Sequence, residues 1–187
     1  MVNAREWVER FLDAAEAEAD ALGELDRLAG DGDFGASVRT AVRSTRRGLG
    51  DAPPFAALST AYLGTGGTSG PLYGMFFRAL AKAAGDASEL DLATLADGVG
   101  AGVASVRRLG GAQVGERTMV DALQPAADAL AAGEGLDAAA RAARAGADAT
   151  ADLVARRGRA TYVGDAAAGV VDPGAALVAL FFEAAAG

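Results

Sequence analysis

Apolar residues recur every three or four positions along most of this chain, and this helical spacing is the feature that most limits its fold. The first example runs from Trp7 through Phe11 and Ala15 to Leu22. Such spacing gives one apolar face to an amphipathic helix, whereas the alternation typical of half-buried strands is nearly absent. Alanine and glycine are abundant, and small side chains permit close helix contacts. The sequence therefore predicts an all-α protein.

The same spacing, with proline and glycine at the boundaries, predicts eight helices. They span about 7–22, 36–47, 55–63, 69–84, 91–109, 118–131, 136–157 and 173–187. With 187 residues, of which 51% are hydrophobic, the chain is long enough for one well-buried core. We therefore expect a single domain over residues 1–187, folded as an eight-helix, up-and-down, antiparallel barrel or bundle.

Charge and composition exclude several classes of function. The formal net charge is −8 and Lys82 is the only lysine, so we expect neither nucleic-acid binding nor a polybasic membrane-surface protein. No apolar signal core or membrane-length segment is visible, and we expect a cytoplasmic protein. Cysteine and histidine are absent, which excludes disulfides, thiol catalysis and a phosphohistidine on this chain. Any phosphate transferred here must be carried by a bound small molecule, a carboxylate or a partner.

The connections between the predicted helices alternate in character. Those after the second, fourth and sixth helices are plain, whereas those after the first, third, fifth and seventh are rich in glycine and polar residues. These four unusual connections are 30–35, 64–70, 110–119 and 158–174. In an up-and-down bundle every such connection lies at the same end. The alternation therefore predicts one composite site at one end of the bundle.

The first of these connections carries three carboxylates, those of Asp26, Asp31 and Asp33. Carboxylates held this close repel one another, whereas a hard divalent cation with oxygen ligands relieves the repulsion. A magnesium site is one interpretation. A solvated turn with helix-capping aspartates is the other, and the residues alone do not decide between them.

The other connections offer groups that suit a phosphorylated ligand. Glycines in 64–70, followed by a helix start at Ser69, allow backbone N–H groups to approach an anion, although a flexible linker has the same composition. Arg159 suits charge neutralisation, or else complements a helix C-terminus. Leu72, Met119 and Pro173 are core residues or an adenine-contacting wall.

Taken together, four ordered motifs resemble the L-subunit family of dihydroxyacetone kinase over nearly the full length. The motifs are Leu25-Asp26 with GDGDFG at 30–35, GGTSGPLYGMFF at 66–77, GERTMVDAL at 115–123, and GRATYVG at 158–164 followed by DPGA at 172–175. The resemblance implies an eight-helix barrel that binds ADP or ATP at one rim.

The resemblance also implies roles for particular residues. Two Mg²⁺ ions would be held by Asp26, Asp31 and Asp33, which together with Arg159 form the implied catalytic set. The implied nucleotide contacts are Phe34, Gly35, Ala36, Ser37, Thr68, Ser69, Gly110, Thr118, Met119, Arg159, Asp172, Pro173 and Gly174. Phe34 departs from the family pattern, because a histidine follows GDGD there and is expected to touch phosphate.

In that family a separate K subunit holds the ketose that receives the phosphoryl group. A stand-alone L chain points to the phosphoenolpyruvate-dependent type, in which a phosphoryl-donor M subunit recharges resident ADP, and a homodimer stays open. Two other readings also stay open. One is the nucleotide-binding domain of a fatty-acid kinase, and the other is a non-catalytic nucleotide-sensing adaptor of a regulator.

Overall fold

The computed structural model describes residues 1–156 and 168–186, and within them the chain is almost entirely helical. The described α-helices are α1 (Ala4–Ala17), α2 (Ala19–Ala29), α3 (Phe34–Gly48), α4 (Pro54–Leu63), α5 (Ser69–Ala84), α6 (Leu92–Gly110), α7 (Val120–Ala131), α8 (Leu136–Ala149) and α9 (Pro173–Ala186). A 3-10 turn, η1 (Thr150–Asp152), follows α8. The all-α prediction is confirmed.

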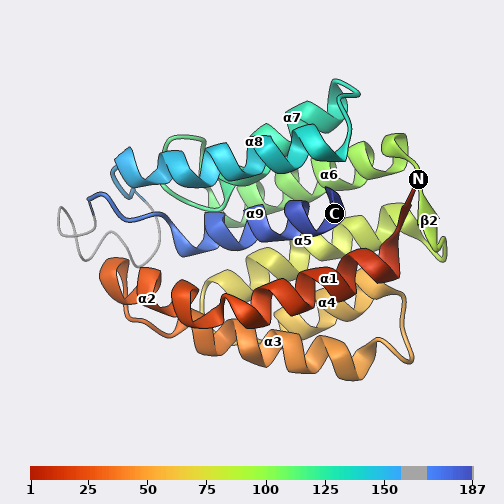
Figure 1. Cartoon of the computed structure of the whole chain (residues 1–187), viewed down its shortest axis with the longest axis horizontal. Coiled ribbons are helices and arrows are strands. Elements are labelled where there is room, and N and C mark those ends of the chain that lie inside the picture. The colour runs from red at the N-terminus through yellow and green to blue at the C-terminus, as the bar shows by residue number, and fades with distance from the viewer. Residues whose placement is uncertain (157–167, 187) are drawn as a thin grey trace.

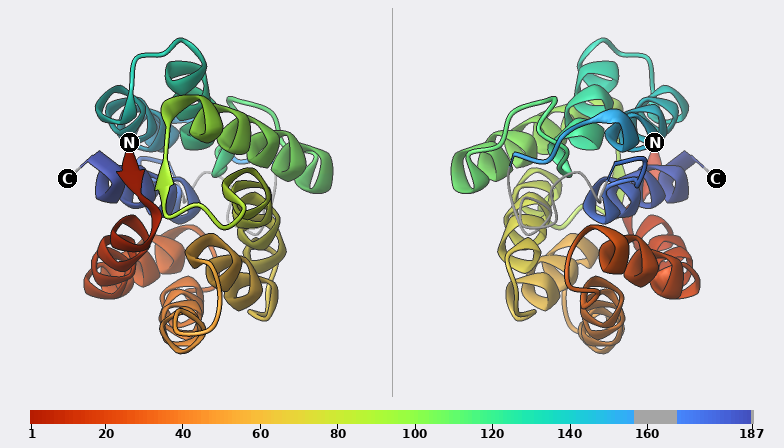
Figure 2. Two further views of the ribbon diagram at one scale, coloured as in Figure 1. Left: turned by 90° about the vertical axis from the view of Figure 1, so that its right-hand side faces the viewer. Right: turned by 90° about the vertical axis from the view of Figure 1, so that its left-hand side faces the viewer.

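Helices that follow one another in the sequence pack side by side, and α9 returns to contact α1. The long helices run roughly parallel or antiparallel to one common axis (Figure 1). Viewed along that axis they form a ring (Figure 2). The α1–α9 seam is held by Trp7, whose ring stacks on Phe181 with centroids 4.5 Å apart and whose indole N–H donates to the Phe181 carbonyl at 2.7 Å.

Two helix predictions need correction. The first expected helix is divided at Glu18 into α1 and α2, because Glu18 leaves helical geometry with ψ near 1°. The helix expected to reach about Arg157 ends at Ala149. There the Thr150 hydroxyl donates to the Ala147 carbonyl and accepts the N–H of Asp172, so the end of α8 is joined to the approach to α9.

A short antiparallel pair, β1 (Val2–Asn3) and β2 (Glu89–Leu90), lies at the end of the barrel that also holds the N-terminus (Figure 1). Two helix starts at this end, those of α1 and α6, are capped by side chains. Asn3 accepts the N–H groups of Arg5 and Glu6 at the start of α1, and Asp91 accepts that of Thr94 in α6. In the described parts of the chain, no helix combines the length and apolarity that crossing a membrane requires.

Candidate functional site

A cleft opens at the end of the barrel opposite the β1–β2 pair, and all four unusual connections contribute to its walls. It contains about 1050 Å³ of space free of protein atoms, part of it open to solvent. The residues that line it are Asp26, Ala29, Asp33, Phe34, Ser37, Gly66, Gly67, Thr68, Ser69, Leu72, Tyr73, Val106, Gly110, Ala112, Arg117, Thr118, Met119, Val120, Asp172, Pro173 and Gly174.

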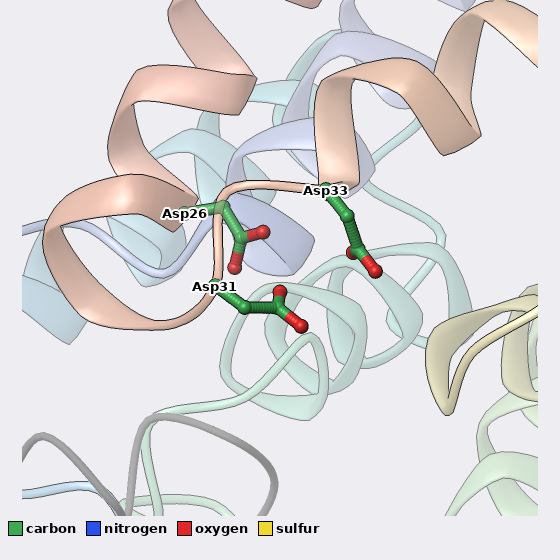
Figure 3. Close-up of side chains that lie close together, drawn as sticks. All are labelled: Asp26, Asp31 and Asp33. Carbon is green, nitrogen blue, oxygen red and sulfur yellow. The ribbon is translucent and has the colours of Figure 1, made fainter.

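One wall carries the three carboxylates of the α2–α3 turn. Asp26 lies in the last turn of α2, and Asp31 and Asp33 follow in the turn itself. Each offers an oxygen that lies within 4.8 Å of an oxygen of the other two, and the side chains extend toward the same region (Figure 3). This set of hard oxygen donors fits a magnesium ion.

The surroundings of Asp26 explain why a cation suits this place. Its carboxylate accepts the N–H of Phe34 at 3.0 Å, which joins the end of α2 to the start of α3. Burial raises the pKa of Asp26, and repulsion from Asp31 and Asp33 raises it further, although the Phe34 N–H opposes the shift. Holding this cluster fully ionised therefore costs free energy that a bound cation offsets.

The second wall is the glycine-rich connection before α5. Gly67 has a φ of 86°, in the left-handed region that favours glycine. At Gly70 a Cβ would collide with the carbonyl oxygens of Thr65 and Tyr62, so the connection lies directly against the first turn of α5. This packing brings Gly66 to Ser69 to the edge of the cleft at a helix N-terminus, where backbone N–H groups are free to bind an anion.

The third wall is the connection between α6 and α7. The Asp121 carboxylate accepts the N–H groups of Gly115 and Thr118, which fixes the loop around the residues between them. Within this loop Arg117 is only 2% exposed and has a φ of 60°. Met119 is buried at the start of α7 and, with Leu72 and Val106, gives this side of the cleft an apolar surface.

The fourth wall is the start of α9. The Asp172 carboxylate accepts the N–H of Ala175 at 2.8 Å, and the Tyr73 hydroxyl donates to the Gly174 carbonyl at 2.6 Å. Burial of its carboxyl raises the pKa of Asp172 to about 6, while Arg117 acts in the opposite direction. A carboxyl group that titrates near neutral pH thus faces the cleft.

The structure brings most of the predicted site residues together. Those that line the cleft are Asp26, Asp33, Phe34, Ser37, Thr68, Ser69, Gly110, Thr118, Met119, Asp172, Pro173 and Gly174. Asp31 belongs to the carboxylate cluster instead. Gly35 and Ala36 lie in the first turn of α3 but do not line the cleft. Arg159 lies outside the described residues.

The sequence analysis does not single out Arg117, although this residue belongs to the GERTM stretch at 115–119. The residue type gave no warning, because an arginine in a loop is usually solvated. Tyr73 and Val106 also line the cleft, but apolar helical spacing assigns such side chains to the core. The signal that could have found Arg117 is its position within one of the four convergent connections.

Comparison of the sequence with known protein families identifies the family to which this helical barrel and its four-walled cleft belong. The DAK2 domain family model matches residues 28–187, and the chain belongs to that family. It is 32% identical to the ADP-binding subunit DhaL of PEP-dependent dihydroxyacetone kinase 1 from Listeria innocua, over 97% of this chain and 93% of that protein.

Longer relatives contain the same unit. The chain is 38% identical to L-erythrulose 1-kinase of Mycolicibacterium smegmatis over 91% of its own length, but it spans only 32% of that enzyme. A crystal structure of the dihydroxyacetone kinase from C. freundii in complex with AMP-PNP and Mg²⁺ superposes with a TM-score of 0.75 at 32% identity. That match covers 98% of this chain and 34% of the C. freundii chain.

Proposed function

We propose that this chain is the nucleotide-binding subunit of a dihydroxyacetone-type kinase. It binds ADP or ATP with Mg²⁺ in the cleft and takes part in phosphoryl transfer to a small ketose held on a separate K subunit. The observation that carries the proposal is the position of the Asp26, Asp31 and Asp33 cluster at the wall of a cleft whose opposite walls are a glycine-rich helix start and an apolar surface. The carboxylates and the helix start suit metal-bound phosphates, and the apolar surface suits an adenine ring.

The metal assignment rests on the donor set. The carboxylates of Asp26, Asp31 and Asp33 would supply the oxygen ligands for two Mg²⁺ ions. When bound, Mg²⁺ neutralises charge on the β- and γ-phosphates, which an acidic turn would otherwise repel. The chain's own contribution is to hold Asp26 in place through the Phe34 N–H and to exclude water with the Phe34 ring, which is 8% exposed.

We assign each part of the nucleotide to a wall of the cleft. Phosphates lie beside the first turn of α3, near Ser37, and the adenine lies among Thr68, Ser69, Gly110 and Met119. Asp172 to Gly174 close the cleft on the α9 side. We assign Arg159 to phosphate neutralisation on the resemblance alone.

The ketose acceptor is assigned to a partner for two reasons. No lysine or histidine lines the described cleft, and of its aspartates Asp26 and Asp33 are assigned to the metal ions while the Asp172 carboxylate accepts the N–H of Ala175, so we assign the general base to the partner. In addition, seven large apolar side chains are exposed among the described residues, and five of them lie near this end of the barrel: Leu28, Leu63, Leu109, Val114 and Val154. An exposed apolar rim is typical of a docking surface. The 32% identity to the ADP-binding subunit of a PEP-dependent dihydroxyacetone kinase from Listeria innocua supports the phosphoenolpyruvate-dependent type, in which a donor subunit recharges ADP.

Two measurements test this function. Mass spectrometry of the purified native protein is expected to detect co-purifying ADP, and calorimetry is expected to show Mg²⁺-dependent ADP binding. A coupled assay with K subunits loaded with dihydroxyacetone, and with phosphoenolpyruvate-dependent donor subunits or ATP, then measures turnover. Tight ADP binding without transfer in any pairing would favour the adaptor reading. Absence of any nucleotide binding would refute the proposal.

A further inference from the structure

Arg117 combines three features that the nucleotide site described above does not use. It is the one non-glycine residue with positive φ in the described parts of the chain, a conformation that is costly for a residue with a Cβ. Its side chain is almost completely buried, at 2% exposure. Its Nε has no hydrogen-bond partner among the described residues, and no ion pair to its guanidinium is formed among them. Burying a cation without an ion-pair partner costs free energy. The buried position of Arg117 therefore calls for an explanation.

The surrounding loop enforces this position. Asp121 accepts the N–H groups of Gly115 and Thr118, which flank Arg117 on both sides. The carbonyl of Glu116 accepts the N–H of Arg156, so the loop is also held against the chain that follows η1. The left-handed backbone at Arg117 is therefore imposed by its neighbours, and its effect is to turn the side chain inward.

The inward side chain contacts the wall formed by the start of α9. Its Nη2 donates to the carbonyl of Val170 at 2.6 Å, two residues before Asp172. On the other side, the Thr150 hydroxyl accepts the N–H of Asp172 at 2.8 Å. Arg117 and Thr150 thus hold the same short segment from two directions, and Asp172, Pro173 and Gly174 at its end line the cleft. The charge of Arg117 also favours the ionised form of Asp172.

We infer that Arg117 is a positioning residue for nucleotide binding, which fixes the Val170–Gly174 wall of the cleft through its bond to the Val170 carbonyl. The inference rests on the proposed function, because it concerns the nucleotide that occupies this cleft. Although Arg117 lines the cleft, its Nη2 is bonded to the Val170 carbonyl and its Nε is buried, so it acts through the wall. The ligand class is a magnesium-bound adenine nucleotide.

The test compares ADP affinity, measured by calorimetry with excess Mg²⁺, among four single variants. Arg117→Gln removes the charge and is expected to weaken binding about tenfold, the effect of losing one charged hydrogen bond. Arg117→Lys keeps a charged donor and is expected to recover most of the affinity. Thr150→Val removes the second attachment of the same wall and is expected to weaken binding as well. Arg108→Gln is the matched control, because Arg108 is exposed in the last turn of α6 and bonds only Ser105 among the described residues.

A double-mutant cycle separates positioning from general loss of structure. Because Arg117 and Thr150 hold one segment, the double variant is expected to lose less affinity than the two single losses combined. All measurements are made well below the melting temperature of each variant, which circular dichroism records. Unchanged ADP binding by Arg117→Gln overturns the inference alone, as does Arg117→Lys binding as weakly as Arg117→Gln. Failure of the wild-type chain to bind ADP overturns the proposed function and this inference together.

Discussion

The two ends of the barrel use the same residue types for opposite purposes. At the β1–β2 end, Asp91 accepts hydrogen bonds from Thr94 at the start of α6, and these bonds lower its pKa. At the cleft end, Asp26 also accepts a backbone N–H, yet burial and two neighbouring carboxylates raise its pKa. The Asp91 carboxylate stabilises the fold without a ligand, whereas keeping the Asp26 carboxylate ionised costs free energy until a cation binds.

This difference separates the end of the barrel that stabilises the fold from the end that binds a ligand. At the β1–β2 end, polar side chains meet backbone partners that the helix starts leave free. At the cleft end, the described structure gathers a carboxylate cluster, a strained Arg117 and an exposed apolar rim, all of which are unfavourable in an isolated domain.

The largest effect is expected from Gly35→Ala at the cleft end. A Cβ at Gly35 would collide with the Ala19 carbonyl oxygen and press on the backbone of Gly23, so α2 and α3 must separate. We expect a loss of about 2–3 kcal/mol of stability and a melting temperature lower by roughly 5–10 °C. Gly50→Ala, in the turn before α4 at the other end, is the control, because no atom lies within 4 Å of its Cβ position. Equal melting temperatures for the two variants would contradict the close α2–α3 packing.

The second prediction concerns the buried carboxyl of Asp172, measured without metal or nucleotide. Because its pKa is raised to about 6, the folded state binds a proton more readily than the unfolded state between about pH 4 and 6. This group therefore destabilises the fold above pH 6, and the penalty disappears as the pH falls through that range. Asp172→Asn is expected to be more stable than wild type by roughly 1–3 kcal/mol at pH 7.5, with the gain vanishing toward pH 4.

Denaturant unfolding at a series of pH values measures this difference. Asp97→Asn provides the comparison, because Asp97 is exposed on α6 away from the cleft, and its difference in stability from wild type is expected to be small. A gain for Asp172→Asn that stays constant from pH 7.5 to pH 4 would show that ionisation of the carboxyl is not the cause.

The third prediction tests the carboxylate cluster directly. Asp31→Asn is expected to weaken Mg²⁺-dependent ADP binding at least tenfold, or about 1.4 kcal/mol, because one of three clustered oxygen donors loses its charge. Asp86→Asn, exposed in the turn before α6 at the β1–β2 end, is the calorimetric control. Equal affinities for both variants would remove Asp31 from the site.

The sequence predicts the helices well where apolar spacing is strong, as in α6, expected over 91–109 and observed over Leu92–Gly110. It misses the division at Glu18, because apolar spacing continues across the break. It also extends α8 too far, since alanine-rich sequence continues the helical pattern while the end is set by the Thr150 contacts from a distant segment.

The site shows the same limit. Clustered aspartates and glycines are visible in the sequence because their chemistry is unusual at close spacing. The resemblance implies that Gly35 lies beside phosphate, and the structure adds a second need for a glycine at this position, because a Cβ there would collide with the Ala19 carbonyl oxygen of α2. Arg117 escaped notice because its burial depends on the Val170 carbonyl, 53 residues away. The local sequence pattern identifies groups that bind ligands. Contacts between residues far apart in the sequence determine which side chains hold those groups in place.

The smallest effect is expected from Asn3→Ala at the β1–β2 end. Asn3 accepts the N–H groups of Arg5 and Glu6 at 3.1 Å, and loss of such a helix cap costs about 1 kcal/mol, or roughly 2–4 °C in melting temperature. Asn3→Ser retains a capping oxygen and is expected to recover most of that loss. ADP affinity is expected to be the same in both variants and in wild type, because the cap lies at the end of the barrel opposite the cleft (Figure 1). A change of more than about threefold in ADP affinity would show that the two ends are energetically coupled, and the division of the barrel into a stabilising end and a binding end would then be wrong.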